Sequence, residues 1–161
     1  MKSGVIAKLK IRRIHNLLNE DVEELHDESK KEGYNLIDKL INGFKSGENK
    51  FSKKGECLIV CEIDNKIVGI CGLNIDPLNP RRGRIRRLYV LPPYRDKGVG
   101  RELVKELIHY SNKHFKSVSV NTGNLNVSEF YEELGFKKYD KENGITHLLI
   151  NKQPNENRQE E

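Results

Sequence analysis

Two glycines and three cationic residues lie together in the segment Arg95-Asp96-Lys97-Gly98-Val99-Gly100-Arg101. Apolar residues recur at helical spacing from Val99 to about residue 112, so a helix is predicted to begin inside this segment. The first turn of a helix leaves its backbone N–H groups unpaired, and the helix dipole adds about half a positive charge there. Gly98 and Gly100 carry no side chain that would keep a ligand away from these donors. We interpret residues 95–101 as a cradle for a phosphate or pyrophosphate, with simple helix-start packing as the alternative.

Two common phosphate-binding motifs do not fit this segment. A Walker loop requires Gly-x-x-x-x-Gly-Lys-Ser/Thr, and a dinucleotide fingerprint requires a third glycine where Leu103 stands. What remains is Arg-x-x-Gly-x-Gly behind a strand that ends in Val-x-Pro, and this resembles the acetyl-CoA loop of the GNAT superfamily of N-acetyltransferases. A second segment resembles the other signature of that family, because Asn124 lies seven residues before Tyr131, which is followed by Leu-Gly-Phe at 134–136.

The resemblance covers most of the chain, is weakest before Gly55, and implies acetyl-CoA as cosubstrate, a primary amine as acceptor and no metal. It assigns the pyrophosphate to residues 95–101 and the pantetheine arm to backbone groups of residues 88–90, with the acetyl carbonyl near the amide of Val90. Asn124 is expected beside the CoA arm, although Asn126 could share that role and a helix-cap role is the alternative. The expected cofactor-binding set is Leu88, Tyr89, Val90, Arg95, Asp96, Lys97, Gly98, Val99, Gly100, Arg101, Asn124 and Tyr131.

Tyr131 is the expected catalytic residue. The thiolate that leaves in acetyl transfer has a pKa of about 8.5, and a phenol with a pKa of about 10 is a suitable proton donor to it. The alternative is a core tyrosine on an amphipathic helix, but the Leu-Gly-Phe that follows favours the catalytic interpretation.

The general base is not assigned. Many relatives carry a glutamate on the central strand four residues before the Leu of Leu-x-Val, and here that position is Arg84. An alkylamine is mostly protonated at pH 7, so its proton must still be removed. The alternatives are a water chain or one of Glu56, Glu62, Asp76 and His147. The missing glutamate also favours a second hypothesis, an acetyl-CoA-binding sensor without turnover.

Charged residues point to different acceptors. The arginines between Arg81 and Arg87 are typical of a solvated strand edge, of a site for a carboxylate- or phosphate-bearing acceptor or, ranked last, of nucleic-acid binding. The acidic residues between Glu20 and Glu28 favour a cationic amine instead. The acceptor, a small molecule or a peptide or protein amine, therefore stays open.

The elements that must position these residues form a recognisable order. Strands are predicted over residues 7–14, 56–63, 67–75, 84–91, 117–122, 136–139 and 145–150. Two helices are predicted between Glu20 and Gly47, the first starting at Glu20 with Asn19 as its cap, followed by the helix from Val99 and a short helix closed by Gly135. Residues 76–83 are predicted as a loop, and the imperfect alternation of residues 84–91 predicts a bulge or burial on both faces. This order predicts a single α/β GNAT-type domain over residues 1–152, with a mixed, mostly antiparallel sheet of about seven strands and about four helices, splayed at the central strands to admit CoA. Residues 153–161 are expected to be a disordered polar tail.

Composition sets outer bounds. The chain has 161 residues, a formal charge of +5 and 33% charged residues, without an apolar run of membrane-spanning length or a signal-peptide pattern. We expect a soluble cytoplasmic monomer or homodimer. The three cysteines lie on predicted strands and are odd in number, which argues against a disulfide framework or a zinc site. The histidines lack the spacing of metal ligands, which also argues against a metal site.

Overall fold

The computed structural model describes residues 8–152, and the predicted tail at 153–161 lies outside this range. Seven strands form one sheet in the order β1-β2-β3-β4-β5-β7-β6, in which only β4 and β5 run parallel. The predicted α/β class with seven strands and four α-helices is confirmed. The strands are β1 (Lys10–Ile14), β2 (Cys57–Ile63), β3 (Lys66–Asp76), β4 (Asn79–Val90), β5 (Ser117–Val120), β6 (Lys137–Lys138) and β7 (His147–Ile150). The helices are α1 (Glu23–Lys31), α2 (Leu36–Ser46), α3 (Val99–Ser111) and α4 (Leu125–Glu133), with short 3₁₀ turns at Leu17–Asn19 and Pro92–Tyr94.

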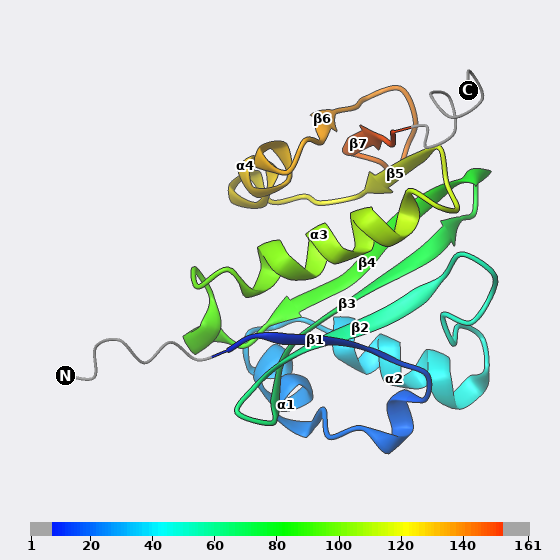
Figure 1. The fold of residues 1–161 in the computed structure, drawn as a ribbon. Coiled ribbons are helices and arrows are strands. Elements are labelled where there is room, and N and C mark those ends of the chain that lie inside the picture. Colours follow the sequence, from blue (N-terminus) through cyan, green and yellow to red (C-terminus); the bar gives the residue numbers. More distant parts are fainter. Residues whose placement is uncertain (1–7, 153–161) are drawn as a thin grey trace, which may run out of the picture.

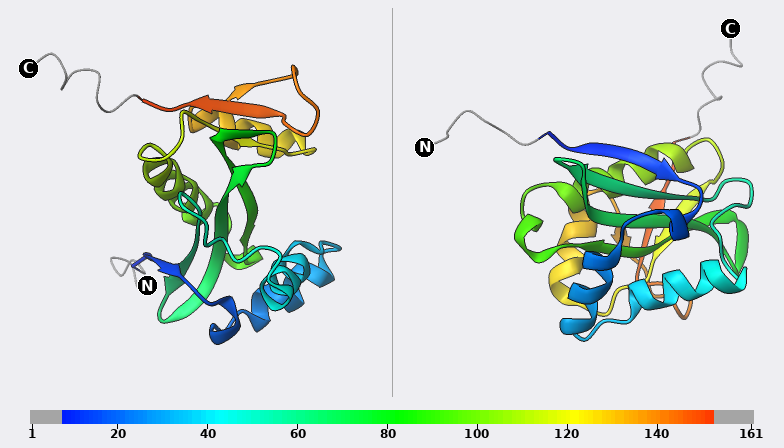
Figure 2. Two further views of the ribbon diagram at one scale, coloured as in Figure 1. Left: turned by 90° about the vertical axis from the view of Figure 1, so that its right-hand side faces the viewer. Right: turned by 90° about the horizontal axis from the view of Figure 1, so that it is seen from below.

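Helices cover both faces of the sheet. Helices α1 and α2 pack on one face and α3 on the other (Figure 1, Figure 2). Glycines of β3 allow this close packing: a Cβ at Gly69 would lie 2.8 Å from the Val99 side chain of α3, and one at Gly72 would collide with the ring of Phe51 on the opposite face. The apolar side chains of the strands and of the helices packed on them form one continuous buried core.

Two connections between strands are tight turns. Asp64 and Asn65 join β2 to β3 with φ angles of 53° and 63°, which confirms the predicted hairpin. The predicted loop at 76–83 is wrong, because Asp76 pairs directly with Asn79. The carboxylate of Asp76 also accepts the N–H of Leu78 at 2.9 Å, a hydrogen bond that stabilises this tight turn. Pro80 is compatible with a strand because it stands near the strand's first residue.

The first helix begins later than predicted. Asn16, rather than Asn19, caps the chain after β1, since its side chain accepts the N–H of Leu18 and starts the 3₁₀ turn at 17–19. Helix α1 then begins at Glu23. Helix α2 ends, as predicted, at a left-handed Gly47 with a φ of 81°.

A buried ion pair ties β4 to the connection between β6 and β7. The guanidinium of Arg82 donates to Asp76 at 2.8 Å and, with its other nitrogens, to both carboxylate oxygens of Glu142 at 3.0 Å. Ser119 of β5 also donates to Asp76, at 2.9 Å. Burial would raise the pKa of Asp76, but these hydrogen bonds hold it below its ordinary value. Residues 142–144 are thereby held over the edge of β4.

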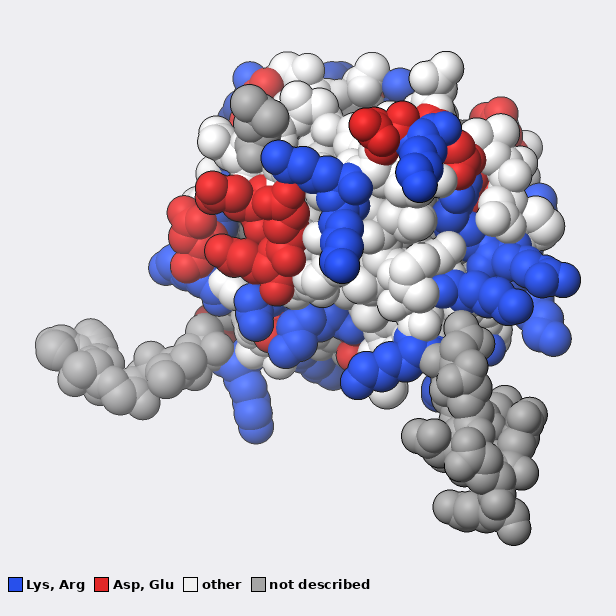
Figure 3. Space-filling view, turned by 90° about the horizontal axis from the view of Figure 1, so that it is seen from above, with Lys and Arg blue, Asp and Glu red and all other residues white. Residues whose placement is uncertain are grey.

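Charge is unevenly distributed over the surface. On the face shown in Figure 3, acidic side chains form one group and basic side chains form others. The surface charge is therefore negative at some places on this face, although the net charge of the chain is +5. None of the helices in residues 8–152 has the length and apolar character needed to cross a bilayer.

Candidate functional site

The central strand β4 parts from its neighbour β5 halfway along its length. The two strands pair only from Arg82 to Arg84, opposite Ser117 to Ser119. Beyond Arg84, β4 continues to Val90 with β3 on one side and no paired strand on the other. This opening is the splay predicted for the central strands.

A β-bulge interrupts β4 within the splayed half. The register with β3 steps from Gly72↔Arg86 to Ile70↔Tyr89, so two residues of β4 lie opposite one residue of β3. The first of the two, Arg87, has a φ of 62°, a left-handed conformation that is uncommon for a residue with a long side chain. Of the two predicted explanations for the broken alternation, the structure shows the bulge.

The bulge changes which side chains of β4 face which layer. Residues that pair across strands share a face, so Arg86 lies with Gly72 on the α1–α2 side, and Val90 lies with Gly69 on the α3 side. Tyr89 also turns to the α1–α2 side, where its hydroxyl reaches Glu32 at 2.6 Å. The backbone at 88–90 is thereby held between the two layers.

The backbone N–H of Val90 points into the splay. Leu91 donates its N–H to Val68 of β3 at 2.9 Å, and alternation along the strand turns the N–H of Val90 the other way. The carbonyl of Val90, on the same side, accepts a hydrogen bond from Nε of Arg95 at 2.9 Å. Because β5 has diverged here, no strand of the described residues 8–152 accepts the N–H of Val90.

Helix α3 starts beside this opening without a side-chain cap. Gly98 is its N-cap residue, with a φ of 87°, and it provides no side-chain cap for the first N–H groups of the helix, nor does another side chain in the described part of the chain. A Cβ at Gly98 would meet nothing within 4 Å, whereas one at Gly100 would lie 3.6 Å from Phe130 of α4 and 3.7 Å from Val90. The left-handed φ alone accounts for glycine at position 98. The open space in front of free donors additionally suits a polyanion such as a diphosphate.

Arg95 does not contribute the free charge that the sequence suggested. Its guanidinium donates to both carboxylate oxygens of Glu32, at 2.8 and 2.6 Å, and stacks on the ring of Tyr89 at 5.3 Å. These hydrogen bonds hold the pKa of Glu32 below its ordinary value. Glu32 lies 63 residues from Arg95, and no local pattern marks it. Lys97 and Arg101 are exposed and form no ion pair within residues 8–152, so their positive charges remain available at the start of α3.

Tyr131 is buried on α4. Only 3% of it is exposed, and its ring packs edge-on against Phe130 and Phe136, with centroids 5.0 and 5.3 Å away. Burial, and secondly the neighbouring thiol of Cys71, raise the pKa of this phenol far above its ordinary value. The hydroxyl forms no hydrogen bond with another described side chain or backbone group. Tyr131 is therefore protonated at any physiological pH.

Asn124 has the helix-cap role that was the alternative to CoA binding. It is the N-cap residue of α4, and its side-chain oxygen accepts the N–H of Asn126 at 2.9 Å. Both residues are exposed, and the side-chain amide N–H groups of Asn124 remain available. A contact of either residue with CoA stays a prediction.

The three carboxylates considered as general bases already have partners. Glu62 binds Arg12 at 3.0 Å, and Asp76 binds Arg82 at 2.8 Å. Glu56 accepts two backbone N–H groups, from residue 53 at 3.2 Å and residue 75 at 2.9 Å. Each of these carboxylates stabilises the fold where it stands.

His147 and Arg84 are also engaged. The two ring nitrogens of His147 lie 2.8 Å from the hydroxyl of Ser128 and 2.9 Å from that of Thr146. Burial lowers the pKa of His147, which favours the neutral ring. Arg84, at the position of the family glutamate, donates to the carbonyl of Gly144 at 3.0 Å.

Comparison with known proteins agrees with this geometry. The sequence profile of the Acetyltransferase (GNAT) family matches residues 11–136. N-acetyltransferase 8 from Homo sapiens is 30% identical over 93 residues, which are 54% of this chain and 41% of that protein. The match to the curated relatives spans between 39% and 59% of their length.

Solved structures share the fold. A protein from Exiguobacterium sp. 255-15, provisionally described as an acetyltransferase, superposes with a TM-score of 0.80 at 24% identity over 89% of this chain and 93% of its own. The PaiA N-acetyltransferase from Thermoplasma acidophilum, solved in complex with coenzyme A, superposes with a TM-score of 0.59 at 19% identity over 89% of this chain and 99% of its own.

Proposed function

This chain belongs to the GNAT acetyltransferase family, and we propose that it transfers the acetyl group of acetyl-CoA to a primary amine by direct attack in a ternary complex. The observation that carries the proposal is the position of the Val90 N–H. It points into the gap between β4 and β5, next to the uncapped start of α3. A structural relative of this fold has been solved with coenzyme A, which supports the same ligand here.

The chain's own donors fit the two ends of the cosubstrate. We assign the diphosphate to the N–H groups at the start of α3, with Lys97 and Arg101 adding charge. When bound, acetyl-CoA supplies an activated thioester carbonyl. The N–H of Val90 stabilises negative charge on the oxygen of that carbonyl, and removing one such donor typically slows turnover about 100- to 1,000-fold.

Tyr131 donates the proton to the leaving sulfur. The phenol is protonated at physiological pH, and its hydroxyl has no hydrogen-bond partner within residues 8–152, so its proton is available to the thiolate while the rings of Phe130 and Phe136 pack against it. Phe130, the residue before Tyr131 in α4, lies close to Gly100, so α4 packs beside the start of α3 and the proposed diphosphate site.

The proton of the acceptor amine passes to solvent water. All four candidate side-chain bases are held by other residues, and Arg84 occupies the family's glutamate position. We infer that water on the α1–α2 side of β4 removes this proton. Turnover should then rise with pH until the amine itself is neutral.

The engaged bases also favour a second candidate, an acetyl-CoA sensor without turnover. One pair of measurements separates the two. Calorimetry with acetyl-CoA tests the cradle, and release of free thiol with a panel of primary amines tests the chemistry. Binding with turnover on any amine supports the acetyltransferase, and binding without turnover on the whole panel supports the sensor. Absence of binding at millimolar acetyl-CoA excludes both.

A further inference from the structure

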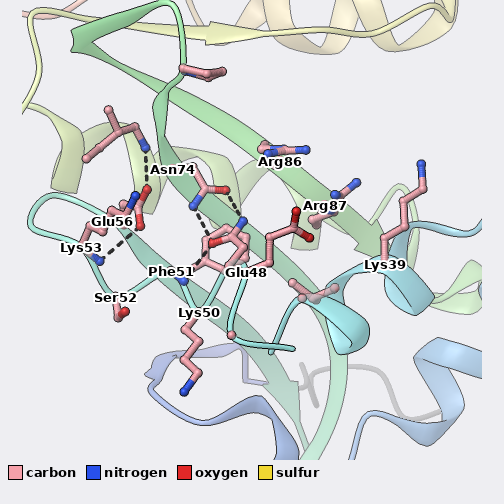
Figure 4. Close-up of a pocket in the computed structure, with 16 residues that line it drawn as sticks. Lys39, Glu48, Lys50, Phe51, Ser52, Lys53, Glu56, Asn74, Arg86 and Arg87 are labelled. Carbon is pink, nitrogen blue, oxygen red and sulfur yellow. Dashed lines mark hydrogen bonds between the residues drawn. The ribbon is translucent and has the colours of Figure 1, made fainter. Parts of the chain in front are cut away.

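A cavity of about 460 Å³ lies beside the bulge of β4, on the face that carries α1 and α2. This volume is within the range of small-molecule sites. Five basic side chains and two carboxylates are among the residues that line it, namely Lys39, Lys50, Lys53, Arg86, Arg87, Glu48 and Glu56. Figure 4 shows that the side chains of Arg86, Arg87 and Lys39 lie toward one side of the cavity, whereas Lys50 points away from it.

Arg86 and Arg87 are half-buried cations without a partner anion. Within residues 8–152, neither guanidinium forms an ion pair or donates a side-chain hydrogen bond. Burial, and after it the charges of neighbouring arginines, lower the pKa of both groups. Adjacent like charges that are partly removed from water are costly unless an anion joins them.

The carboxylates that line the cavity do not supply this anion. Glu56 is occupied by two backbone N–H groups, and Glu48 is exposed and forms no ion pair with a described residue. Arginines elsewhere on the same face do have partners, since Arg82 binds two carboxylates and Arg84 binds a carbonyl. Among the arginines on this face of β4, Arg86 and Arg87 are therefore the two whose guanidinium groups have no hydrogen-bond acceptor within residues 8–152.

The backbone that presents these arginines has an uncommon conformation at the bulge. Arg87 has a φ of 62° at the bulge, a conformation that glycine would adopt more readily. Across the cavity, Asn49 and Asn74 exchange two amide hydrogen bonds of 3.0 Å, and Phe51 packs on Gly72.

The cavity is also within reach of the proposed acetyl site. Arg87 and Val90 are three residues apart on one strand, which corresponds to about 10 Å at ~3.3 Å per residue. An acceptor whose anionic end lies at Arg86 and Arg87 can therefore present its amine near the N–H of Val90.

We propose that Arg86 and Arg87, with Lys39 beside them, bind an anionic group of the acceptor, a carboxylate or a phosphate. The acceptor is then a small primary amine that carries a negative charge about 10 Å or less from its nitrogen. Planar guanidinium groups match the oxygens of both anions. The assignment of this anion to an acceptor rests on the proposed acetyltransferase function.

Anion binding can be tested without acetyl-CoA. Nuclear magnetic resonance of the arginine Nε–H groups, titrated with inorganic phosphate and separately with acetate, reports directly on the two side chains. We expect saturable shifts of the Arg86 and Arg87 resonances. In Arg87→Gly, the remaining Arg86 resonance should report an affinity at least fivefold weaker, whereas the control Arg81→Gln should leave the affinity unchanged. Arg87→Gly should fold normally because its φ favours glycine. Absence of shifts with both anions, or stronger shifts with short duplex DNA than with phosphate, would overturn the proposal.

Matched acceptors test the role of the anion in turnover. If the site binds a carboxylate, we expect kcat/KM to be at least tenfold higher for β-alanine than for its amide. If it binds a phosphate, we expect the same difference between phosphoethanolamine and ethanolamine. Arg87→Gly should reduce that ratio about tenfold with little change for the uncharged amine, whereas equal use of charged and uncharged amines contradicts the proposal. If the resonances shift but no amine is acetylated, the proposed function fails while the anion site stands.

Discussion

The guanidinium of Arg95 forms a two-pronged ion pair with Glu32, which lies at the end of α1, at distances of 2.8 and 2.6 Å. The same guanidinium donates through Nε to the carbonyl of Val90. One side chain thus connects three parts of the molecule: the helical layer, the end of β4, and the loop that leads to α3. Glu32 and Arg95 therefore link the end of α1 to the loop of the proposed cosubstrate site.

Glu32→Gln should loosen this loop with little effect on global stability. Both partners are partly exposed, so the loss in unfolding free energy should stay below about 1 kcal/mol. Hydrogen exchange of the amides at 95–101 should accelerate several-fold, and the KM for acetyl-CoA should rise. Glu28→Gln, which removes an exposed pair with Lys31, is the matched control. Unchanged exchange at 95–101 would show that Glu32 does not order the loop.

Tyr131→Phe tests the proton donor. The hydroxyl forms no hydrogen bond within the described part of the chain, so the variant should fold with nearly unchanged stability. We expect acetyl-CoA affinity within a few-fold of the wild type and turnover at least tenfold slower, since a positioned acid typically contributes 100- to 10,000-fold. Tyr110→Phe, remote from α4 on α3, should keep full activity. Unchanged turnover in Tyr131→Phe would remove this residue from the mechanism.

Gly98→Asn tests the cradle at the start of α3. Asparagine tolerates a left-handed φ, and the new side chain would enter open space, so stability should fall by no more than about 1 kcal/mol. The affinity for acetyl-CoA, measured by calorimetry, should nevertheless fall at least tenfold because the side chain covers the free N–H groups. Gly47→Asn, at a left-handed helix end with a φ of 81°, controls for the substitution itself. Equal affinity of both variants would contradict the assignment of the diphosphate to this loop.

Local sequence signals predicted the parts of the site whose physical cause is local. The hairpin at 64–65, the glycines of the α3 start and the bulge in β4 each depend on the conformational freedom or alternation of a few adjacent residues. The choice of Asn16 over Asn19 as a cap could not be predicted in this way, because both residues have the same propensity and only the packing of the chain after β1 distinguishes them.

The parts that the sequence did not predict depend on contacts between distant residues. The pairing of Arg95 with Glu32 removes a charge that the loop sequence seemed to offer. The arginine run divides in the same way, since Arg82 acquires two carboxylates while Arg86 and Arg87 acquire none within residues 8–152. Neighbouring arginines in the sequence therefore have different roles: Arg82 forms a structural ion pair, whereas Arg86 and Arg87 form a candidate binding site.

His147 should make stability depend on pH just below neutrality. Its pKa is lowered in the folded protein, mainly by burial, from an ordinary value of 6.5. The unfolded chain therefore binds a proton below pH 6.5 that the folded chain resists, so this contribution to stability is present above pH 6.5 and is lost as the pH falls below it. Denaturant unfolding between pH 7 and 5 should show a slope of up to about 1.4 kcal/mol per pH unit from this residue. His147→Gln should flatten that slope, and an unchanged slope would assign the dependence to other groups.

Arg82→Met should be the most destabilising of these substitutions. Asp76 is 1% exposed, and removing its partner leaves a carboxylate buried without a counter-charge, which typically costs about 3–5 kcal/mol. The neighbouring exposed Arg81→Met should change the unfolding free energy by less than about 0.5 kcal/mol.

The double variant Asp76→Asn/Arg82→Met should recover part of the loss, because a neutral amide is less costly to bury than an unpaired carboxylate. Denaturant unfolding of the wild type, Arg82→Met, Asp76→Asn and the double variant measures this coupling, and additive losses in the double variant would mean that Asp76 and Arg82 do not stabilise each other.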